Sequence, residues 1–414
     1  MTKIKITVIH SVLFSILLLA QLYVPSFRVN ILLQLFALGF IFYSNHAKIS
    51  VKFLNTIAPL CFLFVLPLVV GLFYFNNLEN YIKDVFYFLK PVIGVSLGYL
   101  FFKKINNLES FLKVIIFTGF ISTLIHFIVL LFFTNFLSGN VAQIREYGKD
   151  NFLELFALFL FVYRNRFVEK EIFSKKHQKL IFFFLLVSCI MYLSRTMLIV
   201  AFIMYATMAG YTKITKKTIS VLGIFAITIL LFYTYLYSTN IKRGADGIEG
   251  FLYKLKIAPA ELFKTKVDRN DHSKLWDYWR AYEALRAIDL MNETPTSYIH
   301  GTGFGSLVNL KFNAPLVDSA KGIRFISETH NGYVFAIYKS GIIGLFLMMF
   351  FLFSLYRLIY LDKNTLNIFI SGIALTFIFT TLTITGIFNK RDIIIFILGG
   401  LIYFQQRRVI SNER

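Results

Sequence analysis

The chain has 414 residues, of which 57% are hydrophobic and 49 are phenylalanine. No soluble domain of this length can bury so much apolar surface, so the composition excludes a soluble protein and predicts a polytopic integral membrane protein. Lysine and arginine outnumber aspartate and glutamate by 43 to 22, but the basic residues lie in short loops between apolar runs. This pattern indicates anionic membrane lipids as partners and argues against nucleic acid.

Apolar runs long enough to cross a bilayer, about 20 residues each, recur along the chain and predict an all-α fold of about twelve transmembrane helices. Only Ser194, Arg195 and Thr196 separate the seventh run from the eighth. One bent span or two short spans fit this spacing, and the charge pattern favours two. The twelve predicted helices are 6–24, 29–44, 53–75, 84–102, 111–134, 151–164, 179–194, 196–211, 219–238, 331–357, 365–387 and 391–405.

Loop charge predicts the orientation of these helices. With the N-terminus inside, the cytoplasmic segments contain about twenty Lys and Arg, many of them in 164–179, 213–217 and 405–414. Lys and Arg accumulate on the cytoplasmic side of membrane proteins, so both termini are expected in the cytoplasm. The short outer loops hold only six basic residues, which are Arg28, Lys83, Arg145, Lys149, Lys390 and Arg391.

One long polar segment, 239–330, then lies outside, between an N-terminal bundle (1–238, about nine helices) and the C-terminal helices (331–414). It contains both Trp residues and nearly balanced charge, with 13 basic and 11 acidic residues. Apolar residues at helical spacing predict a helix over 273–292. The sequence GTGFGS at 301–306 predicts a turn, because closely spaced glycines tolerate positive φ angles. The domain prediction is therefore a bundle interrupted by one large periplasmic loop.

His330 stands at the last polar position before the helix predicted from residue 331. Histidine is the side chain best suited to accept a proton near neutral pH, so His330 is a candidate general base. The alternative is a purely structural role, in which Thr329 or Asn331 caps the helix and His330 is only hydrated.

Three motifs around this position resemble the bacterial O-antigen ligase and polymerase superfamily. The first is His330-Asn331, nine residues, Gly341, two residues and Gly344. The second is the helix 279–291, WRAYEALRAIDLM, followed by GTGFGS. The third is LSRT at 193–196. The resemblance covers roughly residues 190–345, and the number of helices with one late loop also fits it.

The resemblance implies a GT-C-like membrane fold and glycosyl transfer from an undecaprenyl-diphosphate-linked donor to an acceptor, without metal, cofactor or nucleotide sugar. It implies His330 as the base, Arg195 and Arg280 as diphosphate ligands, inversion at the anomeric carbon, and a site at the periplasmic face of the inner membrane. Arginine suits this role because its planar fork binds phosphate oxygens and stays charged. The donor and acceptor glycans and membrane lipids are the implied partners, and a chain-length regulator is left open.

Alternatives remain for each cation. Arg195 could be a basic residue in a tight turn, and Arg280 could pair with Glu283 or Asp277 on its own helix. Lys90, inside an apolar run, is either an anion ligand or a packed residue whose ammonium reaches an interface. Asn331 is a secondary candidate at the base. The register of the loop arginine is open, and its rivals are Arg269, Arg286 and Arg324.

Two related activities and one unrelated activity fit these observations. A polymerase would transfer the growing glycan to a lipid-linked repeat unit, and a ligase would transfer it to lipid A-core or a protein. The amino-acid sequences of 330–345 and 279–285 resemble the polymerases more than the ligases. A transporter of lipid-linked sugars is the remote alternative, because the two halves of the chain are unlike. The loop histidines lack metal-ligand spacing, so no metal site is predicted.

Overall fold

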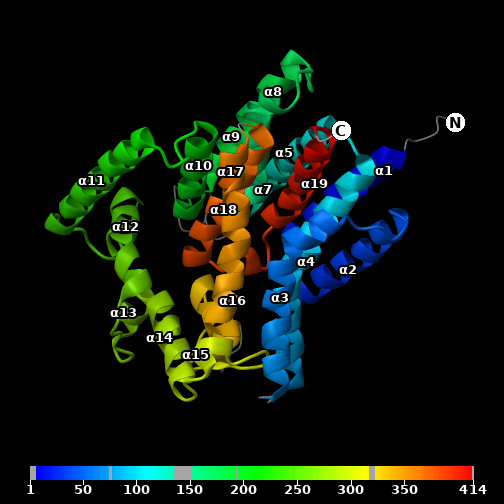
Figure 1. The fold of residues 1–414 in the computed structure, drawn as a ribbon. Coiled ribbons are helices and arrows are strands. Elements are labelled where there is room, and N and C mark those ends of the chain that lie inside the picture. Colours follow the sequence, from blue (N-terminus) through cyan, green and yellow to red (C-terminus); the bar gives the residue numbers. More distant parts are fainter. Residues whose placement is uncertain are drawn as a thin grey trace.

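The computed structural model describes residues 6–73, 77–134, 151–192, 194–245, 247–316, 322–362 and 364–412. All twelve segments predicted to be helices are helices (Figure 1). Helices α9 and α10 are separate, so the prediction of two short helices around Arg195 is confirmed. The twelve are α1 (Ile6–Tyr23), α2 (Phe27–Ser44), α3 (Val51–Phe73), α4 (Leu78–Ile105), α5 (Leu108–Phe133), α7 (Phe152–Val162), α9 (Lys175–Met191), α10 (Arg195–Met208), α11 (Lys216–Ser238), α16 (Gly332–Tyr356), α18 (Thr365–Thr383) and α19 (Ile394–Asn412).

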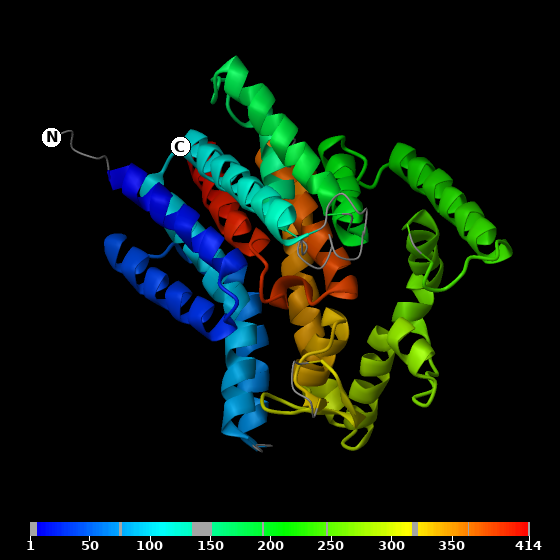
Figure 2. The same cartoon turned by 180° about the vertical axis from the view of Figure 1, so that it is seen from behind.

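Among the described residues, eight helices are long and apolar enough to span a membrane. The other four of the twelve, α7, α9, α10 and α19, are shorter or more polar. The protein is thus an all-α polytopic membrane protein, and eight of the twelve predicted helices have the full length and hydropathy of a span within the described part of the chain. Short helices α8 (Arg164–Phe167) and α17 (Leu358–Leu361) extend its connections. The start of α1 and the end of α19 lie at one end of the bundle, as Figure 2 shows.

Helix α4 forms the centre of the bundle, where it packs against α2, α3 and α19. Its contact with α19 is close because Gly98 leaves no side chain between it and the backbone at Phe396. In contrast, α11 is almost entirely exposed and packs mainly on α12 (Gly247–Phe263), to one side of the bundle in Figure 1. An apolar helix with so little protein contact is typical of a lipid-facing span.

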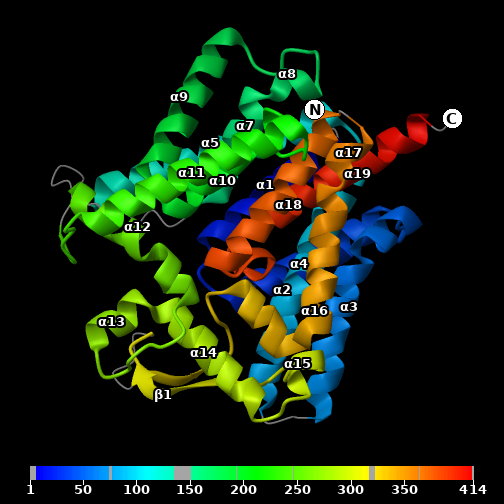
Figure 3. The ribbon, with the colours of Figure 1, turned by 60° about the vertical axis from the view of Figure 1, so that its left-hand side comes forward.

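The segment 239–331 forms a layer across the other end of the bundle (Figure 3). The helix predicted over 273–292 is broken at Tyr278 into α13 (His272–Asp277) and α14 (Trp279–Asn292). A short α15 (Ser297–His300) and an antiparallel pair, β1 (Val308–Ala314) and β2 (Ile323–Ile326), follow it. These strands were not predicted from the sequence. Strand β1 packs on α13 and α14 through a small apolar core of Leu275, Trp279, Tyr282, Leu310 and Ala314.

The predicted glycine turn at 301–306 is confirmed, and it docks into a break in α16. Gly341 has φ 65° and ψ −170°, which is non-helical backbone that only glycine adopts without strain. The Gly303 N–H donates a hydrogen bond of 3.0 Å to the carbonyl of Lys339 just before this break. A β-carbon on Gly341 would collide with the carbonyl of Ile299. The glycine at this position is therefore required by both its φ angle and the close approach of α15.

A buried ion pair ties the same turn to the central helix. The Lys339 ammonium lies 2.5 Å from the carboxylate of Asp84 on α4, and both side chains are fully buried. The Gly305 N–H donates to the same carboxylate at 2.8 Å. Buried charges of this kind are stable only when paired and hydrogen-bonded. The turn, α4 and α16 thus form one fixed unit beneath the loop segment.

We expect Gly341→Ala to destabilise the fold by about 1–3 kcal/mol from backbone strain alone, with a further cost from the clash at Ile299. Thermal unfolding of the detergent-solubilised protein, followed by fluorescence of the two loop Trp residues, measures this. Gly223→Ala in α11 is the matched control, because nothing lies within 4 Å of a β-carbon at that site. Equal unfolding temperatures for the two variants would contradict the role assigned to Gly341.

Candidate functional site

Glu283 of α14 holds His330 in place by two contacts. The backbone N–H of His330 donates to Oε2 of Glu283 at 2.9 Å, and the ring Nδ1 of His330 lies 2.8 Å from the same oxygen. The Glu283 side chain is 2% exposed, whereas that of His330 is 51% exposed. A carboxylate only accepts hydrogen bonds, so Nδ1 carries the proton and donates it. This arrangement leaves Nε2 as the nitrogen available to a substrate.

Glu283 also sets the charge state of His330. The hydrogen bond to its carboxylate raises the pKa of His330, although partial burial opposes this. Glu328 raises the pKa of His330 further, while Arg280 lowers it, so both charges act on the ring. A raised pKa stabilises the folded protein below the unfolded value, about 6.5. This contribution is lost as pH rises through the folded value.

Arg280 and Arg195, the two predicted diphosphate ligands, meet at one carboxylate. Arg280 lies one helical turn before Glu283 on α14, and its Nη1 donates to Glu261 of α12. Arg195, the first residue of α10, places Nη2 3.8 Å from the other oxygen of Glu261. The structure therefore pairs Arg280 with Glu261, in place of the Glu283 or Asp277 partners considered from the sequence.

The two arginines and the start of helix α10 together favour an anion at this position. The carboxylate of Glu261 already lies between two arginines, and the backbone N–H groups at the start of α10 add partial positive charge. The buried Nε of Arg280 has no hydrogen-bond partner among the described residues. This atom is a spare donor for a ligand larger than a carboxylate.

The secondary candidates lie in other surroundings. Asn331 caps α16, because its side chain accepts from the N–H groups of Tyr333 and Val334 at 3.0 and 3.3 Å. Lys90 is fully buried, and its ammonium donates to the carbonyls of Asn389 and Asp392. Arg269 donates to the carbonyl of Lys311 at 3.2 Å, Arg324 to Asn309 at 3.3 Å, and Arg286 to the carbonyl of Asn309 at 2.8 Å. The three rival arginines thus contact the strand β1, away from Glu261.

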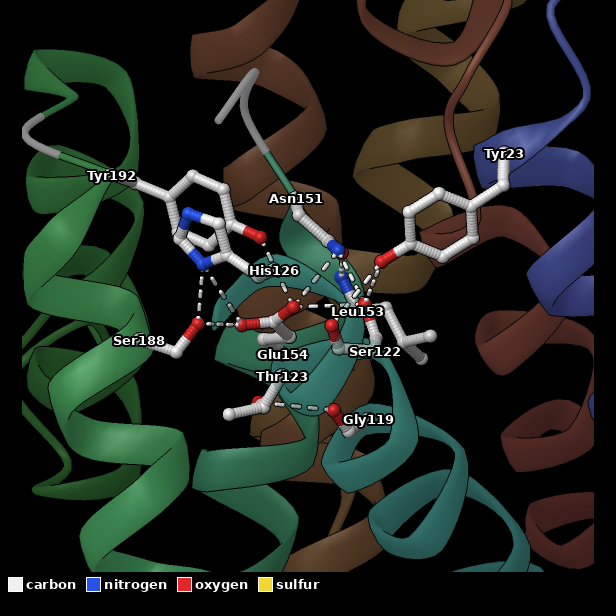
Figure 4. A network of polar contacts seen from close by, with 10 residues as sticks. All are labelled: Tyr23, Gly119, Ser122, Thr123, His126, Asn151, Leu153, Glu154, Ser188 and Tyr192. Atoms are coloured by element: carbon white, nitrogen blue, oxygen red, sulfur yellow. Dashed lines mark hydrogen bonds and ion pairs between the residues drawn. The ribbon is translucent and has the colours of Figure 1, made fainter. Parts of the chain in front are cut away.

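A second polar cluster lies inside the helix bundle, around Glu154 of α7 (Figure 4). One carboxylate oxygen accepts from Ser122 at 2.8 Å, Tyr192 at 3.0 Å and Asn151 at 3.1 Å, and the other accepts from Ser188. The cluster joins α5, α7 and α9, and Tyr23 joins α1 to it through Ser122. His126 of α5 lies in this cluster, hydrogen-bonded to Ser188 at 2.6 Å.

Glu283 and Glu261 are the functional candidates that the sequence analysis missed. Glu283 was considered only as a helical partner of Arg280, although it lies in the motif WRAYEAL beside that arginine. Its contact with His330 joins residues 47 positions apart, which no local pattern indicates. No group of three or more His, Cys, Asp or Glu side chains suited to a metal ion occurs within the described ranges.

Comparison with known families adds one match. Residues 180–349 match the family model Wzy_C, described as O-antigen ligase. This stretch contains Arg195, Arg280, Glu283 and His330, and the whole of the loop segment. No curated protein is similar enough to the chain to count as a match.

We expect Glu283→Gln to lower the pKa of His330, because the substitution removes the negative charge that favours imidazolium. A pH titration by NMR with labelled histidine measures this value, with the His330 resonance assigned from a His330→Gln sample. Glu293→Gln, at the exposed end of α14, is the matched control and should leave the titration in place. An unchanged His330 pKa in Glu283→Gln would show that the contact is absent in solution.

Proposed function

We propose that the chain is a membrane glycosyltransferase that acts on lipid-linked glycans. The match of residues 180–349 to the O-antigen ligase family supports this, because it places the chain in the O-antigen polymerase and ligase superfamily. The specific reaction is polymerisation. A growing glycan moves from undecaprenyl diphosphate to a lipid-linked repeat unit at the outer face of the bacterial inner membrane. In this proposal both termini are cytoplasmic and the loop segment is periplasmic.

The observation that supports this most directly is the line of charges from Arg195 through Glu261 and Arg280 to Glu283 and His330. Positions i and i+3 on a helix are neighbours, so Arg280 and Glu283 place a cation beside the residue that orients the base. A transferase of this kind needs both groups within reach of one anomeric carbon. The base acts on the acceptor hydroxyl, and the cations act on the departing diphosphate.

The proposed step is a direct displacement. Nε2 of His330 accepts the proton of the acceptor hydroxyl, and the hydroxyl oxygen forms a bond to the anomeric carbon of the donor. The bond from that carbon to the diphosphate oxygen breaks, and the oxygen keeps the electron pair. Arg195 and Arg280 stabilise the released charge, while Glu283 stabilises the imidazolium. One displacement inverts the anomeric carbon. The reaction also accelerates as pH rises through the pKa of His330, since only the neutral ring accepts a proton.

Glu261 has a defined part in this proposal. Its carboxylate offsets the positive charge of the two guanidinium groups while the donor is absent. Without it, two arginines that both lie beside Glu261 would repel one another. The donor diphosphate then takes its place between Arg195 and Arg280 and also reaches the free Nε of Arg280. A planar guanidinium group can bind two phosphate oxygens at once. Glu261 offers one oxygen to each arginine, so neither guanidinium has this two-oxygen contact with it.

The second candidate function is a ligase, which the match to the O-antigen ligase family favours. It uses the same donor, base and arginines, and differs only in its acceptor. Glycan analysis of a strain lacking the chain separates the two. Surface glycans capped with single repeat units indicate a lost polymerase, whereas lipid-linked polymer with none attached to the surface indicates a lost ligase.

We expect His330→Ala to reduce turnover by about 10²–10⁴-fold, which is the usual contribution of a positioned general base. The assay measures elongation of lipid-linked repeat units by the purified protein, together with its unfolding temperature to exclude misfolding. His272→Ala is the matched control, because His272 is an exposed histidine of the same loop segment. Normal glycan lengths with His330→Ala would refute the base assignment.

We expect Arg280→Lys to lower kcat/KM by roughly 10- to 100-fold, because lysine keeps the charge but loses the fork and the spare Nε donor. Arg269→Lys serves as control, since Arg269 donates to the β1 backbone at Lys311. The same elongation assay, run over a range of donor concentrations, measures both variants. Wild-type kinetics for Arg280→Lys would assign the diphosphate to another cation.

A further inference from the structure

A second group of charges includes Glu328, which acts on the charge of His330, and the proposed chemistry does not use this group. It combines Lys83 and Tyr87 of α4, Lys390 from the turn before α19, and Glu328, two residues before His330. Both lysine ammonium groups lie over the ring of Tyr87, with distances to its centroid of 5.8 Å for Lys83 and 5.1 Å for Lys390. The Lys390 ammonium is 2.8 Å from the Glu328 carboxylate.

This group has more positive than negative charge. Lys390 pairs with the Glu328 carboxylate, whereas Lys83 forms no ion pair among the described residues. The neighbouring Arg28 and Glu79 already balance one another at 2.5 Å. Although burial disfavours the charged form of Lys390, Glu328 outweighs it and raises the pKa of this ammonium, so the charge persists at neutral pH. Two ammonium groups over one tyrosine ring, of which only Lys390 is shown paired with a carboxylate, attract a further anion.

The position of Lys390 is fixed by buried contacts. Lys90, fully buried in α4, donates to the carbonyls on either side of it, at Asn389 and Asp392. Gln21 of α1 donates to the carbonyl of Lys390 itself. Tyr87 is only 2% exposed and stacks on Phe27 at 4.7 Å. Lys90 therefore acts as a positioning residue for this turn.

The distance from His330 decides which substrate group this site can take. The Cα atoms of Glu328 and His330 are at most about 7 Å apart, and the Glu328 carboxylate acts on the charge of the His330 ring. In the proposed reaction the accepting hydroxyl is at His330 and the donor diphosphate is at Arg195 and Arg280. The diphosphate of the acceptor is at the far end of its repeat unit. An anion beside His330 must therefore belong to the accepting sugar or to its neighbour.

We propose that Lys83 and Lys390 bind a carboxylate on the accepting sugar or its neighbour, so that the acceptor is an acidic glycan. The inference rests on the proposed function, because it takes the base and the diphosphate site from it. Glu328 shows that a carboxylate fits beside Lys390, and lysine suits a single carboxylate as a compact charge. In the absence of the acceptor, Glu328 holds the place that the sugar carboxylate takes.

The test compares three acceptors with the purified full-length protein in nanodiscs, with native lipid-linked polymer as donor at a fixed saturating concentration. The first acceptor is the native lipid-linked repeat unit from a strain lacking this chain. The second is the same material with its carboxylates reduced to alcohols. The third is the native repeat unit released from its lipid diphosphate by mild acid.

We expect the wild-type protein to use the native acceptor at least tenfold better than the reduced one, by kcat/KM. The double variant Lys83→Gln/Lys390→Gln should lose this preference, and its ratio should approach one. Lys213→Gln is the matched control, because Lys213 lies 5.5 Å from the ring of Tyr360 and away from His330, and it should keep the preference.

Three outcomes would overturn the inference. One is a native repeat unit with no acidic sugar by chemical analysis. Another is equal use of native and reduced acceptors by the wild-type protein. The third is a double variant that loses only the preference for lipid-linked over released acceptor, which would assign the lysines to a diphosphate. If the wild-type protein transfers glycan to none of the acceptors, the proposed function itself fails.

Discussion

The contact between Glu283 and His330 is the interaction on which the site depends. Glu283 is almost fully buried, and a buried carboxylate is stable only with hydrogen-bond donors. His330 supplies two of them, one from its backbone and one from its ring. Because Glu283 belongs to α14 and His330 directly precedes α16, the same contact fixes the loop segment on the bundle and orients the ring. The position of Arg280 then follows, since it is one helical turn away on α14.

Much of the fold was predictable because membrane helices have a local signal. A run of about twenty apolar residues indicates a span by itself, and all twelve predicted segments are helices. The predictions failed where structure depends on contacts distant in sequence. Tyr278 breaks a helix whose apolar spacing is continuous, and β1 forms only because its partner strand and α14 cover it. The motif around His330 indicated the candidate base and arginines, but Glu261 and Glu283 follow no spacing rule, since their partners come from other elements.

The two groups of cations around His330 are built alike. In one group Glu261 lies between Arg195 and Arg280, and in the other Glu328 pairs with Lys390, which shares the ring of Tyr87 with Lys83. In each group a single carboxylate offsets part of the total positive charge. Such partial neutralisation keeps the cations close together without a ligand, and it leaves each group attractive to an anion. In both groups the carboxylate belongs to the loop segment. Arg280 also belongs to the loop segment, whereas Arg195 and both lysines belong to the bundle.

The cluster around Glu154 has a consequence for the biogenesis of the protein. Helix α7 has 11 residues, about 17 Å at 1.5 Å per residue, which is roughly half the hydrocarbon thickness. It also carries the carboxylate of Glu154, which is energetically costly to place in the lipid hydrocarbon without hydrogen-bond donors. The hydroxyl groups that donate hydrogen bonds to this carboxylate belong to Ser122 of α5 and Ser188 of α9, the helices that flank α7 in the cluster. Helix α7 should therefore leave the translocon together with its neighbours, as a three-helix unit assembled before it meets the lipid.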